Sequence, residues 1–203
     1  MRIRAITTAV VAAGVVFAGL VAPADARSEH HRHEHSSRLG ATTVTTAPGI
    51  AGALIGAGVV PLPVLPRTGF RVSFKDGLAV SYRFPITSNT ADLAHGSGDI
   101  NHAGGILFVS GKTKLEIGRF DIDLAAGKIY ATQVNFAPAR IPVLDLDLSG
   151  LRVGTGHDDS TVLSGIGLKL DPVAAGALNS TFGLSLPTDG SLRFGTARVV
   201  IND

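Results

Sequence analysis

Histidine and aspartate clusters are the features of this chain that could support chemistry. Four of the seven histidines occur close together, as His30, His31, His33 and His35. Neutral imidazoles bind zinc, copper and nickel, and His-rich tracts do so at modest affinity. The segment therefore predicts transition-metal binding at these four residues. The alternative is a soluble spacer that gains positive charge below about pH 6.5, because the spacing matches no preformed metal site.

Two pairs of aspartates form the second cluster, Asp121 with Asp123 and Asp145 with Asp147. Residues two apart on a β-strand lie on the same face, about 7 Å from each other. Such a pair suits a glycosidase or a calcium site, so a hydrolase is a remote alternative. The simpler interpretation is the solvent face of a half-buried sheet. The sequence contains no nucleophile elbow, phosphate-binding loop, dinucleotide-binding motif or zincin motif, so we assign no catalytic residue and expect no enzyme.

The charge and cysteine content narrow the function further. From Leu39 to Asp203 the chain has 13 Lys plus Arg and 13 Asp plus Glu, which gives no net charge. The basic residues alternate with acidic ones and form no stripe, so we expect no nucleic-acid partner. The chain has no cysteine, which excludes disulfides and thiolate ligands. Burial of apolar side chains must therefore stabilise the fold.

Alternating apolar residues predict that short antiparallel strands position these clusters. The segments FRVSF and LAVSYRF flank Asp76-Gly77, a strong signal for a β-hairpin. Similar one-sided segments, separated by glycine turns, continue to the C-terminus. We therefore predict a mainly β domain over residues 41–203, an antiparallel sandwich or a barrel-like sheet.

One predicted strand changes the parity of its apolar residues. In KLEIGRFDIDL, Leu115 and Ile117 are odd-numbered, whereas Phe120 and Ile122 are even-numbered. A β-bulge at Gly118-Arg119 would keep all four side chains on one face of the sheet.

Two short helices are expected to interrupt the strands. The motif P-x-x-A-G-A-L occurs at Pro48–Leu54 and again at Pro172–Leu178. Asp171 is a good N-cap, and proline suits the first turn of a helix. Because strand-like segments flank both copies, the motif also suggests an internal duplication.

The N-terminus predicts where the protein works. Residues 1–26 combine two arginines, an uncharged apolar run and the small residues of Ala24-Asp25-Ala26. These are the marks of a secretory signal peptide that is cut after Ala26 and leaves no transmembrane anchor. Residues 27–40 have almost no apolar side chains, so we expect a disordered His-rich tail. The sequence thus predicts a secreted or cell-surface protein.

The order of the later segments is distinctive. GSGDINHAGGILF is followed by KLEIGRFDIDLAAGKIYATQ, RIPVLDLDLSG, LKLDPVAAGALN and a closing LRFGTARVV. This order resembles the HtaA-type domain of exported actinobacterial proteins. The resemblance implies a domain that binds haem at the cell surface through a tyrosine ligand supported by a histidine.

The chain departs from that family in the residues that would hold a cofactor. It has no tryptophan, and the family's histidine after the Gly-rich strand is missing from Phe108–Gly111. Tyr82 with His95 or His102 could replace the ligands, but the spacing requires neither pair. The cofactor-binding residues are therefore left open.

These observations favour a secreted or envelope-associated binding module without catalytic activity. Haem or another apolar small molecule is the expected ligand, and no cofactor is required for folding. A group of aromatic residues could line an apolar slot or form plain core: Phe70, Phe74, Tyr82, Phe84 and Phe108. The alternatives are a structural envelope protein without a small ligand, metal capture by the tail, and the hydrolase.

Overall fold

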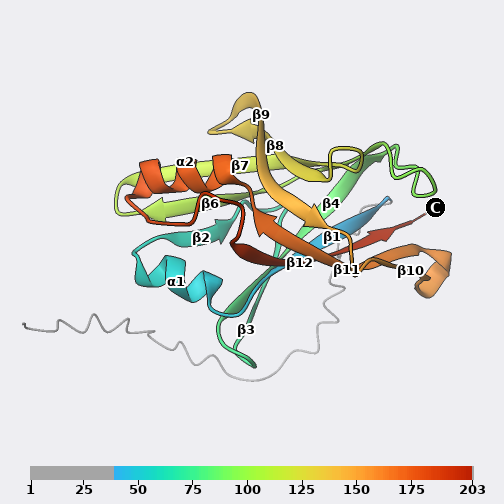
Figure 1. The fold of residues 1–203 in the computed structure, drawn as a ribbon, viewed down its shortest axis with the longest axis horizontal. Coiled ribbons are helices and arrows are strands. Elements are labelled where there is room, and N and C mark those ends of the chain that lie inside the picture. Colours follow the sequence, from blue (N-terminus) through green and yellow to red (C-terminus); the bar gives the residue numbers. More distant parts are fainter. Residues whose placement is uncertain (1–38, 203) are drawn as a thin grey trace, which may run out of the picture. The chain divides into compact units, whose positions relative to one another are not determined.

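Eight strands form a closed antiparallel barrel in a computed structural model that describes residues 39–202 (Figure 1). Around the ring the order is β1, β12, β11, β9, β8, β7, β5 and β4, and pairing of β7 with β8 closes it. The ring strands are β1 (Gly40–Thr46), β4 (Ala79–Asn89), β5 (Asp99–His102), β7 (Thr113–Asp123), β8 (Lys128–Val134), β9 (Ala137–Asp147), β11 (Thr161–Leu170) and β12 (Arg193–Ile201).

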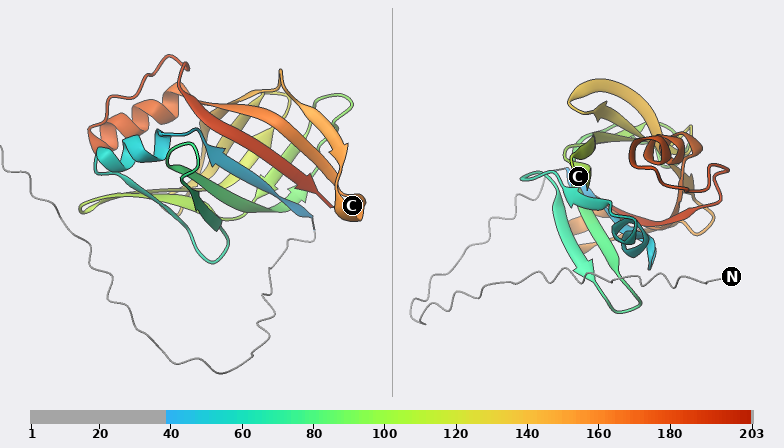
Figure 2. Two further views of the ribbon diagram at one scale, coloured as in Figure 1. Left: turned by 90° about the horizontal axis from the view of Figure 1, so that it is seen from below. Right: turned by 90° about the vertical axis from the view of Figure 1, so that its left-hand side faces the viewer.

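Four further strands extend the ring without belonging to it. β6 (Gly105–Ser110) pairs with β7 and carries β2 (Val60–Pro63) at its far edge, β3 (Gly69–Ser73) pairs with β4, and β10 (Arg152–Thr155) pairs with β11. A short 3-10 turn (His157–Asp159) connects β10 with β11. The helices are α1 (Ile50–Gly56) and α2 (Pro172–Phe182), and both lie across the same end of the barrel (Figure 2).

Local sequence signals explain where α2 begins and ends. The side chain of Asp171 accepts a hydrogen bond from the Val173 N–H at 2.8 Å, and Pro172 occupies the first turn. Gly183 ends the helix with a φ of 67°, a left-handed conformation that suits glycine. Both predicted helices and the predicted N-cap are thus confirmed.

The change of parity in β7 also has a local cause. Arg119 adopts a φ of 53°, and this left-handed residue lets the strand turn over. As a result Leu115, Ile117, Phe120 and Ile122 all point into the barrel. The four side chains thus share one face as predicted, but the cause is the left-handed Arg119 and not the predicted β-bulge, because the β7–β8 register stays continuous across Gly118-Arg119.

The predicted mainly β, antiparallel fold with two short helices is confirmed, and it takes the barrel form. The predicted hairpin forms β3 and β4, with Gly77 in its turn at a φ of 101°. The proposed duplication does not extend beyond the helices. The strands that flank α2 pair with each other, whereas β1 pairs with β4 and β12, and β2 pairs with β6.

The N-terminal predictions fall outside the described residues. These are the signal peptide, residues 1–26, and most of the His-rich tail, including its four histidines. They stay predictions. Within residues 39–202, neither helix is long enough and apolar enough to cross a bilayer.

Candidate functional site

The barrel interior holds an apolar cavity of about 340 Å³. We call this space the barrel cavity. Strands contribute most of its wall, and both helices and the segment after α2 contribute the rest. Its lining includes Val44, Ile50, Leu54, Phe84, Ile106, Phe108, Leu115, Ile117, Phe120, Ile122, Ile129, Ala131, Ile141, Val143, Leu144, Ala174, Leu178, Leu186 and Phe194. Such a cavity excludes ions and suits an apolar molecule.

Strand alternation explains why these side chains meet. Along β4, for example, Val80, Tyr82, Phe84 and Ile86 are buried on the inner face. A barrel of eight strands is just wide enough for side chains to fill it or for one small ligand to enter. Ala131 lies fully buried in the wall, and its small side chain leaves space that a larger residue would take.

The two helices and the segment after α2 cover one end of the barrel cavity. Ala174 and Leu178 of α2 line this end of the cavity, together with Leu184 and Leu186 of the following segment. The amide of Asn179 fixes this segment, because it donates to the Leu186 carbonyl at 2.9 Å and accepts from the Leu186 N–H at 2.7 Å. The cover is therefore held in place by specific bonds.

A lysine ties α2 to the barrel wall. The Lys128 ammonium on β8 donates to Asp145 on β9 and, at 2.7 Å, to Asp171, the N-cap of α2. The hydrogen bonds to the two carboxylates raise the pKa of Lys128 above its usual value, and the bond to Asp145 has the larger effect. The Asp171 side chain is 4% exposed. Its buried negative charge is compensated by the Lys128 ammonium and by the positive end of the helix dipole.

Replacing Lys128 with methionine should therefore loosen the cover. We expect the free energy of unfolding to fall by about 1 to 3 kcal/mol, since the buried Asp171 carboxylate loses a charged partner. Urea titrations of Lys128→Met and of the control Lys112→Met measure this, because Lys112 is exposed and has no ion pair among the described contacts. Equal losses in the two variants would show that the bridge does not stabilise the fold.

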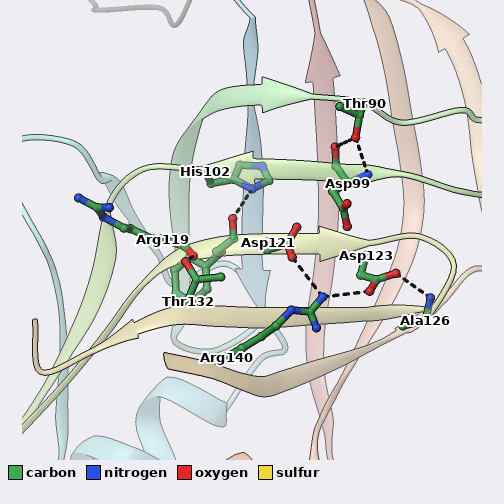
Figure 3. Close-up of polar contacts among 10 residues, drawn as sticks. Thr90, Asp99, His102, Arg119, Asp121, Asp123, Ala126, Thr132 and Arg140 are labelled. Carbon is green, nitrogen blue, oxygen red and sulfur yellow. Dashed lines mark hydrogen bonds and ion pairs between the residues drawn. The ribbon is translucent and has the colours of Figure 1, made fainter. Parts of the chain in front are cut away.

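Thr42 and His102 form a polar pair in the otherwise apolar wall. The His102 Nδ1–H donates to the Phe120 carbonyl at 3.1 Å (Figure 3), so Nε2 of the neutral ring accepts the Thr42 hydroxyl hydrogen at 2.7 Å. Burial lowers the pKa of His102 to about 4. The sequence DINH offered a signal for this, because Ile100 and His102 share one face of β5. We did not use it.

Tyr82, His102 and Tyr130 do not offer haem iron a free ligand inside the barrel. Tyr82 is almost fully buried, its hydroxyl donates to the Pro61 carbonyl at 3.1 Å, and burial raises its pKa, which opposes formation of a phenolate. Both ring nitrogens of His102 are also bonded. The Arg140 guanidinium lies 3.7 Å over the ring centre of Tyr130, outside the cavity lining. These residues do not fit haem in the observed conformation.

The first aspartate pair forms an ion-pair cluster with Arg140 (Figure 3). Arg140 donates to Asp121 at 3.3 Å and to Asp123 at 3.0 Å. Burial raises the pKa of Asp121, and Asp99 adds to the rise, whereas Arg140 opposes it. The pair lies outside the cavity lining, and such charge sharing is typical of a sheet surface.

The remaining predicted residues are not brought together. Asp145 bonds Lys128, whereas Asp147 accepts from the Ser149 N–H and hydroxyl. His95 is exposed and bonds Asp92 at 2.6 Å. Within residues 39–202, no three histidine or acidic side chains are placed to hold a metal ion together.

Phe84 and Phe108 line the barrel cavity as the apolar-slot hypothesis required. Tyr82 belongs to the buried core beside Phe84 and does not line the cavity. For Phe70 and Phe74 the hypothesis of an apolar slot or plain core is wrong. Both are exposed and do not line the cavity, because β3 lies beyond the closed ring and no other strand of residues 39–202 covers that side.

Fold and cavity together define a small antiparallel barrel with an apolar interior and a helical cover. Among solved structures, it is similar to the C-terminal domain of HtaA from Corynebacterium glutamicum, with a TM-score of 0.53. The two share 16% sequence identity, over 80% of this chain and 98% of that domain. This likeness shows an HtaA-like fold. No protein-family model and no curated protein matches the sequence.

Proposed function

We propose that this protein is a secreted, non-catalytic binding module that holds an apolar small molecule in the barrel cavity. The observation that carries the proposal is the cavity itself, about 340 Å³ of space with an almost entirely apolar wall. Well-packed protein interiors leave few voids larger than a water molecule. A space of this size in a barrel is therefore best explained by an occupant.

The cavity volume indicates the size of that occupant. An apolar cavity of about 150 Å³ in another protein binds one benzene ring. By this scale, the barrel cavity holds about a dozen carbon atoms, as in an acyl chain or a short isoprenoid. A porphyrin is much larger. The resemblance to the HtaA-type domain supports haem as the second candidate, but its binding would require Tyr82 or His102 to release a present partner.

Direct titration tests the proposal. Undecanoic acid, an acyl chain of about this size, is expected to bind saturably, one molecule per chain, in isothermal titration calorimetry. Haemin is titrated in parallel into protein that lacks residues 27–38, because free histidines there would bind iron. We expect no saturable Soret band. A Soret band that Tyr82→Phe removes would favour haem, whereas binding of neither compound at micromolar concentration would contradict the proposal.

A further inference from the structure

The turn end of the β3–β4 hairpin projects from the side of the barrel (Figure 2), whereas Ser81–Arg83 of its β4 strand also pair with β1. We call residues 67–83 the basic hairpin. Every residue of β3 is exposed, and β3 pairs only with β4 in the described sheet. The Gly49 N–H at the start of α1 donates to the Leu78 carbonyl at 3.2 Å. The base of the basic hairpin therefore lies beside the helix that covers the barrel cavity.

One face of the basic hairpin is apolar although solvent covers it. Phe70 lies opposite Tyr82, and Val72 lies opposite Val80, so both continue the inner face of β4 beyond the core. Phe70 is 45% exposed, Val72 is 40% exposed, and Phe74 at the tip is 75% exposed. Contiguous exposed apolar side chains on a soluble domain mark an interaction site.

The same hairpin carries a strong local positive charge. It has four basic residues, Arg67, Arg71, Lys75 and Arg83, and one acidic residue, Asp76, which gives a net charge of +3 on a neutral domain. The four basic side chains are exposed. None of them takes part in the ion pairs found among residues 39–202. This charge is therefore available for a partner.

We propose that the basic hairpin docks the protein on the surface of an anionic lipid bilayer. Amphipathic helices with aromatic side chains on one face and Lys or Arg on the other bind such surfaces, and the basic hairpin presents the same two kinds of side chain on its two faces. Each basic residue near the anionic headgroups adds about 1 kcal/mol, and long basic side chains can reach the headgroups while apolar groups enter the acyl boundary.

Docking in this way has a consequence for the ligand. The base of the basic hairpin lies beside the start of α1, so docking would bring this helix, which helps to cover the barrel cavity, close to the bilayer. An apolar molecule could then pass between the bilayer and the cavity with a short path through water. The docking surface itself does not depend on the proposed ligand, because it rests on residues outside the cavity lining.

Vesicle flotation tests the docking with a matched pair of variants. Phe74→Ser removes the exposed tip, and Phe136→Ser is the control, because Phe136 is also 75% exposed but lies at the β8–β9 turn. The chain from Arg27 onward, which contains every described residue, is mixed with phosphatidylglycerol-containing vesicles or pure phosphatidylcholine vesicles. We expect binding to the anionic vesicles only, reduced at least about fivefold by Phe74→Ser and unchanged by Phe136→Ser.

A charge variant and a measurement of the oligomeric state test the proposal further. Arg71→Gln should weaken binding to the anionic vesicles by about fivefold, and added salt should weaken it further. Equal effects of the two Phe variants, or equal binding to both kinds of vesicle, would overturn the proposal. So would a dimer in light scattering that Phe74→Ser converts to monomers, since the basic hairpin would then join two copies of the chain.

Discussion

Replacing Ala131 with phenylalanine is expected to abolish ligand binding while the barrel stays folded. Ala131 is fully buried in β8, opposite Phe120 of β7, and its side chain faces the barrel cavity. A benzyl group there would take up space that the ligand needs. We expect the dissociation constant of undecanoic acid to rise by about a hundredfold or more, which corresponds to the loss of several buried methylene groups.

Stability gives an independent readout of the same variant. Added bulk in a filled core costs about 1 to 3 kcal/mol, whereas added bulk in a real cavity costs little. Chemical denaturation of Ala131→Phe should therefore show a change within about 1 kcal/mol. Ala137→Phe is the control, because Ala137 is exposed on β9. Ligand binding that survives in folded Ala131→Phe would place the ligand outside the cavity.

Acid is expected to destabilise the protein through His102. The pKa of this residue is about 4 in the folded protein and 6.5 when it is unperturbed. Between these values the unfolded chain takes up a proton that the folded protein does not, so stability falls as the pH falls from 6.5 to 4. The expected loss is about 3 kcal/mol at pH 4, and it levels off below that pH as the folded protein takes up the same proton.

Denaturant unfolding at pH 7 and at pH 4.5 measures this effect. His102→Gln should reduce the difference between the two pH values, because its side chain does not titrate. The variant should also be less stable at pH 7, since it disturbs the bonds to Thr42 and Phe120. His95→Gln is the control, as His95 is exposed. An unchanged pH dependence in His102→Gln would show that His102 is not the group responsible.

The sequence predicts the elements of this fold better than their arrangement. Alternation, turn glycines and the N-cap Asp171 are local signals, so the hairpin, the face switch in β7 and both helices follow from them. Alternation also shows which face of a strand is apolar. It does not show whether that face meets a second sheet or curves into a ring, because both solutions bury the same residues.

The exposed aromatic residues show the same limit of prediction from local sequence. Phe70 and Tyr82 belong to one apolar pattern, yet the first is exposed and the second is buried. The difference arises because the ring closes through β4 and leaves β3 outside. Likewise, the ion pair between Lys128 and Asp171 joins residues that are distant in sequence, so no local sequence pattern predicts it.

The pairing of β1 with β12 sets an order on folding. These strands are the first and the last of residues 39–202, and they align from Gly40 opposite Ile201 to Thr46 opposite Gly195. Contacts between distant residues form slowly, because a long loop must close first. The barrel therefore cannot close around its interior before the last strand is available. A chain that emerges gradually, from a ribosome or across a membrane, would stay open until its C-terminal residues arrive.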